Sequence, residues 1–164
     1  MRTRILITVV ATAALAAMAI AGATAEEAPR TGTFNTRAVA LCYGRSDAFR
    51  KRIEAMRAEH EQAMEAGDST RVAELEQWGP ALQDTLHRQV FGDAPIWNII
   101  DLLEDDLPAI AERAGVDAIV VPIHGRPGNG LVDITRAMVE PFDPDEQTLA
   151  MMEDLMGTEP VEME

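Results

Sequence analysis

The side chains best suited to chemistry are three histidines, one cysteine and a group of carboxylates, and their spacing matches no catalytic or metal-binding motif. No two of His60, His87 and His124 lie at a spacing typical of metal ligands, such as the i, i+4 pair of a zinc-binding helix. No serine lies in the pattern of a nucleophile elbow. The sequence therefore predicts no catalytic residue, no metal ligand and no cofactor. It favours a protein that is not an enzyme, with an enzyme of unrecognised site as the least favoured alternative.

Two further features have both a chemical and a structural interpretation. Asp101 and Asp105 lie four residues apart, so they share one face of an expected helix and could bind a divalent cation through their oxygens. The same pattern is typical of the solvated face of an amphipathic helix, which we favour. Cys42 is the only cysteine, so no internal disulfide can form. Because it lies within the apolar run 38–43, we expect a buried side chain rather than a reactive thiol.

Residues 1–25 have the three parts of a cleavable export signal. Met1–Arg4 carries two positive charges, residues 5–20 are uncharged and apolar, and Ala23-Thr24-Ala25 places small residues where a signal peptidase reads them. An uncleaved membrane anchor is the alternative, since residues 5–25 approach the length of a spanning helix. The sequence predicts export across the inner membrane and favours a periplasmic protein. No stable membrane insertion is expected once residues 1–25 are removed.

The chain is strongly acidic. Its 28 Asp and Glu against 14 Lys and Arg give a formal net charge of −14, and loss of Arg2 and Arg4 with the signal lowers this to −16. Such a surface repels nucleic acid and anionic lipid, so we expect no nucleic-acid partner. We expect residues 26–32 to form a flexible leader. The remainder is long enough for one ordinary domain.

The residues after the leader predict a strand and then a helical hairpin over about 46–91. Residues 33–43 place apolar side chains on two alternating faces, which favours a strand covered on both sides. Ser46 is expected to cap the first helix, and Gly67-Asp68-Ser69 to end it and begin the second. Two helices joined by so short a turn must lie antiparallel. Gly79-Pro80 predicts a kink or break in the second helix.

An apolar stripe follows both helices of this predicted hairpin. Its members recur at intervals dominated by three and four residues, which is the period of one helix face. Part of the stripe must pack the hairpin itself, and the remainder is free to meet another protein. The residues that we expect to contact clients or partners are Phe49, Ile53, Met56, Met64, Val72, Leu75, Leu82 and Leu86.

The next part of the chain predicts a helix followed by two strands. The helix is expected from Pro95 to Gly115, with a bend at Pro108. Residues 116–123 are rich in β-branched side chains and predict a strand. Residues 131–134 predict a shorter strand, and we expect the two strands to pair with each other across the glycine-rich loop between them.

The C-terminal part predicts a brief helix from Thr135 and a final helix that ends near Met156. Asp143 is expected to cap the final helix, with Pro144 in its first turn. Residues 157–164 are short and acidic, and we expect a disordered tail. The complete pattern predicts an α+β fold that is mostly helical, with a small β body and a protruding antiparallel helical hairpin.

The segment that follows the hairpin resembles the periplasmic chaperone family known as Skp or OmpH. The matching residues are Gly115-Val116-Asp117-Ala118-Ile119-Val120-Val121 and, after a loop, Val132-Asp133-Ile134-Thr135. They are similar to the aliphatic "VDLIV" strand of the family and to its later "DIT" before the last helix. The leading segment 36–41 also fits in position. The order of predicted elements agrees over most of residues 33–156.

The resemblance implies a trimer whose hairpins form flexible arms around a cavity for unfolded outer-membrane proteins. We therefore expect a holdase-like envelope protein that binds unfolded or partner proteins through its arm and forms a homo-oligomer. The alternative is an interaction module for one dedicated envelope partner. The chain departs from the family in its shorter arm, in the interruption at Gly79-Pro80, and in its acidic charge, since the best-known family members are basic.

Overall fold

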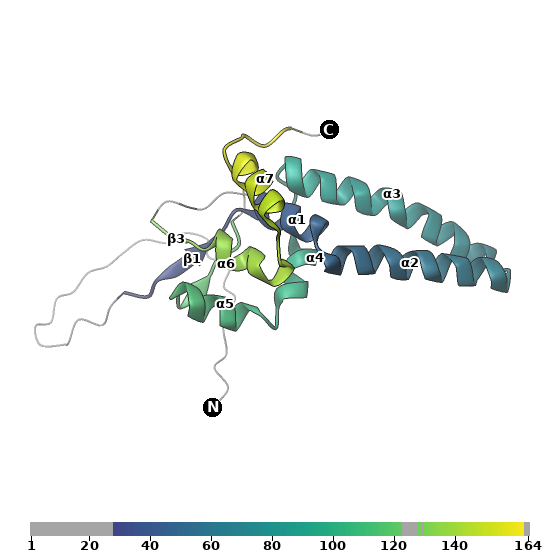
Figure 1. Ribbon diagram of the computed structural model, residues 1–164, viewed down its shortest axis with the longest axis horizontal. Helices are drawn as coiled ribbons and strands as arrows, with labels where there is room; N and C mark the ends of the chain where they lie inside the picture. Colours follow the sequence, from purple (N-terminus) through teal and green to yellow (C-terminus); the bar gives the residue numbers. More distant parts are fainter. Residues whose placement is uncertain (1–27, 123–127, 129, 163–164) are drawn as a thin grey trace, which may run out of the picture.

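The computed structural model describes residues 28–122, 128 and 130–162, and its fold is α+β and mostly helical, as predicted (Figure 1). The expected export signal, residues 1–25, lies outside the described residues. So does most of the glycine-rich loop after residue 122. The elements are β1 (Thr31–Thr33), α1 (Thr36–Arg45), α2 (Asp47–Ala66), α3 (Ser69–Phe91), α4 (Trp97–Ile100), η1 (Asp101–Leu103), α5 (Leu107–Ala114), β2 (Ala118–Ile119), β3 (Val132–Asp133), α6 (Thr135–Val139), η2 (Glu140–Phe142) and α7 (Glu146–Met156).

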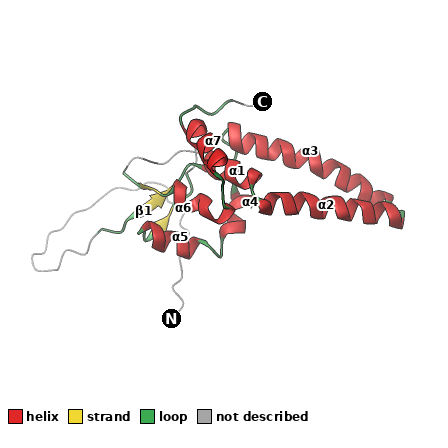
Figure 2. Cartoon of the chain, viewed as in Figure 1, coloured by secondary structure: helices red, strands yellow, loops and turns green. Residues whose placement is uncertain are grey.

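The predicted hairpin forms an arm that projects from the body, and the small sheet lies at the far side of the body from it (Figure 2). Gly67 ends α2 in the left-handed conformation (φ 70°), and its N–H donates to the carbonyls of Ala63 and Met64. Asp68 caps α3 by accepting from the backbone N–H of Arg71 at 3.0 Å. At about 1.5 Å per residue, the 20 residues of α2 span roughly 30 Å.

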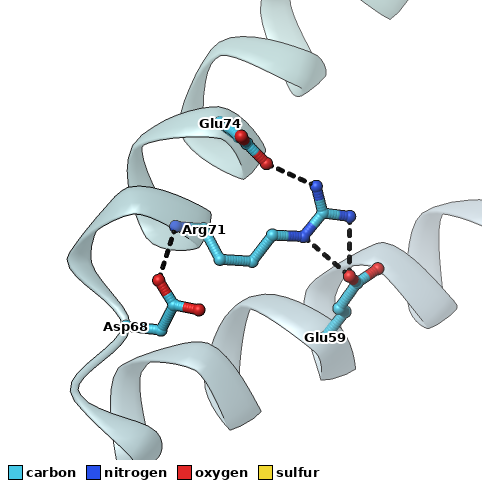
Figure 3. A network of polar contacts seen from close by, with 4 residues as sticks. All are labelled: Glu59, Asp68, Arg71 and Glu74. Carbon is cyan, nitrogen blue, oxygen red and sulfur yellow. Dashed lines mark hydrogen bonds and ion pairs between the residues drawn. The ribbon is translucent and has the colours of Figure 1, made fainter.

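Arg71 ties the two arm helices together next to this turn (Figure 3). Its guanidinium pairs with Glu59 of α2 at 2.6 Å and with Glu74 of its own helix at 2.7 Å. The hydrogen bonds to Glu74 and Glu59 raise the pKa of Arg71 above its ordinary value. The antiparallel pairing of the helices is therefore supported at the tip by a polar network, at a place where few apolar side chains are buried.

The strand predicted over residues 33–43 is wrong, because this segment forms the central helix of the body. Only residues 31–33 form a strand, so β1 begins inside the expected flexible leader. Asn35 then caps α1, its side-chain oxygen accepting from Ala38 N–H at 3.1 Å. Helix α1 is surrounded by α7, α3, α6 and α2, and most of its residues are buried. A helix that is covered on all sides shows no one-sided apolar period, so its sequence looked like a doubly covered strand.

The predicted pairing of the second and third strands is also wrong. The strand order is β2-β1-β3, and β1 pairs in parallel with both neighbours, Gly32 standing opposite Ile119 on one side and Val132 on the other. A Cβ on Gly32 would lie 3.0 Å from the Ile134 side chain, so glycine lets that side chain pack on the strand. Within the described residues, the expected strand 116–123 is reduced to Ala118–Ile119, and the expected strand 131–134 to Val132–Asp133.

Helix α3 continues through Pro80, where a kink or break was expected. Pro80 and Gly79 are both exposed on the arm. A proline inside a helix removes one backbone donor, and its ring crowds the residue before it. Gly79 has no Cβ for that ring to meet, which makes the helical conformation accessible at this position. The arm therefore keeps two uninterrupted helices.

The predicted helix over residues 95–115 is divided into α4, η1 and α5. Pro108 lies in the first turn of α5 rather than at a bend inside a longer helix. The cap of the final helix is also displaced: Asp145 accepts from Thr148 N–H at 2.7 Å, whereas Asp143 takes the left-handed conformation (φ 48°). The cap of the final helix therefore lies two residues later than the sequence pattern predicted.

Arg37 connects α1, the end of α3 and the C-terminal segment. Its side chain is 1% exposed. Nε donates to the carbonyl of Val90 at 2.9 Å, and the two terminal nitrogens donate to the backbone carbonyl of Thr158 at 2.9 Å and to its hydroxyl at 3.2 Å. Val161 N–H donates to the carbonyl of Phe91 at 2.8 Å. Residues 158–161, expected to be disordered, are thus held against the base of the arm.

Candidate binding groove between the arm helices

An apolar groove of about 500 Å³ lies at the base of the arm, where α2, α3 and the end of α1 meet. We name it the base groove. Most of its wall is made by aliphatic and aromatic side chains, with a small number of polar groups at the rim, and it is open to solvent. Its lining residues are Leu41, Gly44, Arg45, Phe49, Ile53, Arg57, Gly79, Leu82, Gln83, Leu86, His87, Val90 and Phe91.

A second groove of about 480 Å³ continues from the base groove toward the tip, and we name it the middle groove. The two share Ile53 and Arg57 from α2, and Gly79 and Gln83 from α3. The remaining lining residues of the middle groove are Met56, His60, Glu61, Leu75, Trp78 and Pro80. Together the grooves form one channel-like surface along the arm.

The groove exists because the arm helices touch near their turn and separate toward the body (Figure 1). Near the tip, Ala63 and Leu75 are each 7% exposed, so the helices are packed there. At the base, α3 packs on α1 instead: a Cβ on Gly44 would lie only 2.7 Å from the Leu86 side chain. Gln89, which is also buried, donates to the carbonyl of Pro95 at 2.8 Å and holds the end of α3 on the body.

Arg52 of α2 links this helix to both α3 and α1. Its guanidinium lies 5.7 Å from the centre of the Trp78 ring, a cation–π distance, and donates to the Tyr43 hydroxyl at 3.3 Å. The Tyr43 ring in turn meets the Phe49 ring edge-on, with centroids 5.3 Å apart. These contacts fix α2 relative to both α1 and α3, so the groove is preformed rather than created by a loose arm.

The structure brings most of the predicted contact residues to this surface. Phe49, Ile53, Leu82 and Leu86 line the base groove; Met56 and Leu75 line the middle groove together with Ile53. Val72 and Met64 line neither groove, and the Met64 side chain is 61% exposed near the turn. The predicted stripe is therefore divided into a groove-lining part and a part near the tip.

Sequence reasoning missed three apolar residues of the base groove, and it did not single out the polar lining residues. Leu41 was placed on a strand, and its helical position became clear only with α1. Val90 and Phe91 end α3 and complete the wall beside Leu86. Val90 follows Leu86 at a spacing of four, so the continued helical period was a signal that could have found it.

The charged residues that line the base groove are basic, although the net charge of the chain is −14. The middle groove is also lined by an acidic residue, Glu61. Arg45 and Arg57 both line the base groove. Among the described residues Arg57 has no hydrogen-bond or ion-pair partner, so its guanidinium is available to a ligand.

Cys42 lies on the other face of α1, away from this groove. It is 1% exposed, and its Sγ contacts Met152 Sδ at 3.9 Å. It also lines a polar pocket of about 330 Å³ between the starts of α2 and α7. Burial raises the pKa of the Cys42 thiol to about 11, although Arg136 and Arg45 act in the opposite direction. At pH 8 the thiolate, which is the reactive form, is therefore scarce.

We expect Cys42 to react with a disulfide reagent such as DTNB at least about a hundredfold more slowly at pH 8 in the folded protein than in the protein unfolded in urea. The difference between the ordinary thiol pKa of 9.0 and about 11 accounts for this factor, and burial adds to it. Stopped-flow absorbance measures both rates. Equal rates would contradict the buried position of the thiol.

The described residues show no metal centre: none of their histidine, cysteine and carboxylate side chains gather in groups of three or more that could hold an ion. Asp101 and Asp105, the candidate cation pair, are both exposed around η1.

Of the helices within the described ranges, none combines the length and apolar character needed to cross a bilayer. Comparison of the chain with protein-family models, with curated proteins and with solved structures finds no match.

Proposed function

We propose that the protein is an exported polypeptide-binding protein whose helical arm holds apolar segments of other proteins, in the manner of a holdase. The observation that carries the proposal is the base groove, an apolar groove of about 500 Å³ that is open to solvent between α2, α3 and the end of α1. Burying a leucine or phenylalanine side chain there would contribute about 1.5–3 kcal/mol, enough for several anchors to hold an unfolded segment.

Two features of the sequence support a chaperone-like use of the arm. Met56 lines the middle groove and Met64 is exposed near the tip, and flexible thioether side chains suit surfaces that adapt to different partners. The acidic net charge keeps a protein with exposed apolar residues soluble. The proposal includes two further predictions. The export pattern of residues 1–25 predicts that the protein acts in the periplasm, and the resemblance to Skp predicts that it forms a trimer.

Suppression of aggregation tests the proposal. The protein is expressed from its full sequence, purified, and mixed in equimolar amounts with citrate synthase unfolding at elevated temperature; light scattering follows aggregation. We expect the wild-type protein to suppress the scattering and Leu82→Asp to lose at least half of that suppression, because a carboxylate is placed in the apolar wall. Ala81→Asp is the matched control: it adds the same charge to an exposed neighbour outside both grooves, and it should behave as the wild type.

Circular dichroism of both variants keeps the comparison valid, since each must retain the helical signal of the wild type. Suppression by Leu82→Asp that equals the wild type would contradict the role of the groove. If the wild-type protein suppresses the aggregation of no unfolded client but captures one envelope protein, the alternative of a dedicated interaction module would be favoured.

Light scattering after size exclusion gives the oligomeric state: a trimer is expected, and a monomer would remove the enclosed-cavity mechanism.

A further inference from the structure

On the basis of the proposed function, we infer that the base groove selects one kind of segment: an amphipathic helix of another protein that bears carboxylates beside its apolar stripe. Arg57 is the residue that recognises those carboxylates. The base groove and the middle groove form the binding surface together, since Ile53, Arg57, Gly79 and Gln83 line both.

The form of the partner follows from the walls of the groove. They consist of side chains from three helices, so they offer no strand edge to an extended segment. An extended chain would leave its own N–H and C=O groups unsatisfied against apolar walls, whereas a helix satisfies them internally. Two helices that separate toward the body also leave room for a third beside them.

The length of the surface agrees with a helix of several turns. Leu75 lines the tip end and Phe91 the base end, and both lie on α3. Their separation along the helix is about 24 Å at 1.5 Å per residue. A bound helix of about four turns would cover it and would present apolar anchors at i, i+4, i+7 and i+11, the pattern of helix-in-groove recognition.

The unpaired guanidinium of Arg57, in the wall of the base groove, indicates the charge of the partner. Other basic side chains near the groove already have contacts: Arg52 meets Trp78 and Tyr43, and Arg45 donates to the Thr148 hydroxyl at 2.9 Å. Arg57 has none among the described residues and stands one helical turn from Ile53, beside the apolar wall. A carboxylate on the rim of a bound helix would pair with its guanidinium.

The acidic net charge does not prevent this selection. At physiological ionic strength, charges separated by more than about 8 Å are largely screened, so distant carboxylates of the chain act weakly on a ligand in the groove. No carboxylate of the described residues lines the base groove, so the guanidinium of Arg57, in direct contact with the ligand, decides the preference there. A segment with lysines at the same positions would place like charges together beside an apolar wall, which is unfavourable.

Two synthetic peptides of 18 residues test the inference. Both carry leucine at i, i+4, i+7 and i+11, and the flanking positions are glutamate in one and lysine in the other. Fluorescence anisotropy at 0.15 M salt measures the two dissociation constants with the purified wild-type protein. We expect the glutamate peptide to bind about tenfold more tightly, the change that corresponds to about 1.4 kcal/mol and is typical of one charge-assisted hydrogen bond.

Arg57→Glu should reverse the preference toward the lysine peptide. Lys51→Glu is the matched control: it makes the same charge change on an exposed residue of the same helix that lines neither groove, and it should leave the preference unchanged. Circular dichroism of the mixture should show added helicity when the glutamate peptide binds. Binding without a gain of helicity would overturn the helical form of the ligand.

The remaining outcomes separate this inference from the proposed function. Equal affinities for the two peptides, both weakened by Leu82→Asp, would overturn the charge selection and leave the apolar groove as a binding site. No measurable binding of either peptide, with aggregation still suppressed through Leu82, would likewise overturn the inference alone. Displacement of the glutamate peptide by laurate at equal affinity would assign the groove to fatty acids. A dimer that dissociates on Arg57→Glu would assign it to a second copy of the chain. Both assignments overturn the inference.

Discussion

Replacing Arg37 with alanine is expected to lower the free energy of unfolding by about 3 kcal/mol, a large part of the 5–15 kcal/mol typical of a domain. The guanidinium is 1% exposed and donates to the carbonyls of Val90 and Thr158. Alanine removes the Arg37 donor from the buried carbonyl of Val90 and from the partly buried carbonyl of Thr158, and it opens a cavity between α1, α3 and the C-terminal segment. Urea denaturation followed by circular dichroism measures the change.

The matched control for this prediction is Arg50→Ala. Arg50 is exposed and pairs with Asp47 on the surface of α2. Exposed pairs of this kind contribute about 0.2–1 kcal/mol, so the control should remain close to the wild type. Hydrogen exchange supplies a second measurement: the amide of Val161, bonded to Phe91 in the wild type, should lose protection in Arg37→Ala. A destabilisation below about 1 kcal/mol would contradict the connecting role given to Arg37.

Replacing Pro80 with alanine is expected to stabilise the protein by about 2 kcal/mol. Pro80 lies inside α3, where proline costs about 3 kcal/mol relative to alanine through a missing backbone hydrogen bond and ring crowding. Relaxation of the exposed arm around the proline reduces this figure. The midpoint of urea denaturation should rise without a change in its slope, because the surface exposed on unfolding stays the same.

Pro108→Ala is the matched control, because Pro108 occupies the first turn of α5, where proline is well tolerated. Its effect should stay within about 0.5 kcal/mol. The double variant Gly79→Ala, Pro80→Ala adds a test of the glycine: alanine at position 79 should stabilise by about 0.5–1 kcal/mol once the proline ring is gone, and by less while Pro80 is present. Equal effects of Gly79→Ala in both backgrounds would refute this explanation of how α3 tolerates Pro80.

The arm was the part of the fold most readily predicted from the sequence. Ser46 and Gly67 act locally, each through hydrogen bonds to its own helix, so their residue types already define where α2 begins and ends. The apolar period of the arm is likewise a local property. It identified the stripe from Phe49 to Leu86, most of which lines the two grooves.

The body was predicted less well, because its elements depend on contacts between distant residues. Residues 36–45 form a helix although their apolar pattern favoured a strand, since burial by four other helices removes the polar face that reveals a helical period. The pairing of β2 and β3 with β1 joins residues nearly 90 or more positions apart, such as Thr31 with Ala118. Strands of two or three residues carry too little pattern to specify such partners.

The sequence by itself determined the class of the fold, the two arm helices and the apolar stripe along them, because helix caps, turns and apolar periods depend on residues that are close together in the sequence. Only the tertiary structure decided that this stripe forms an open groove. That outcome depends on how α3 packs against α1 at Gly44 and Leu86, which separates the arm helices at their base. No local pattern encodes the distance between two helices.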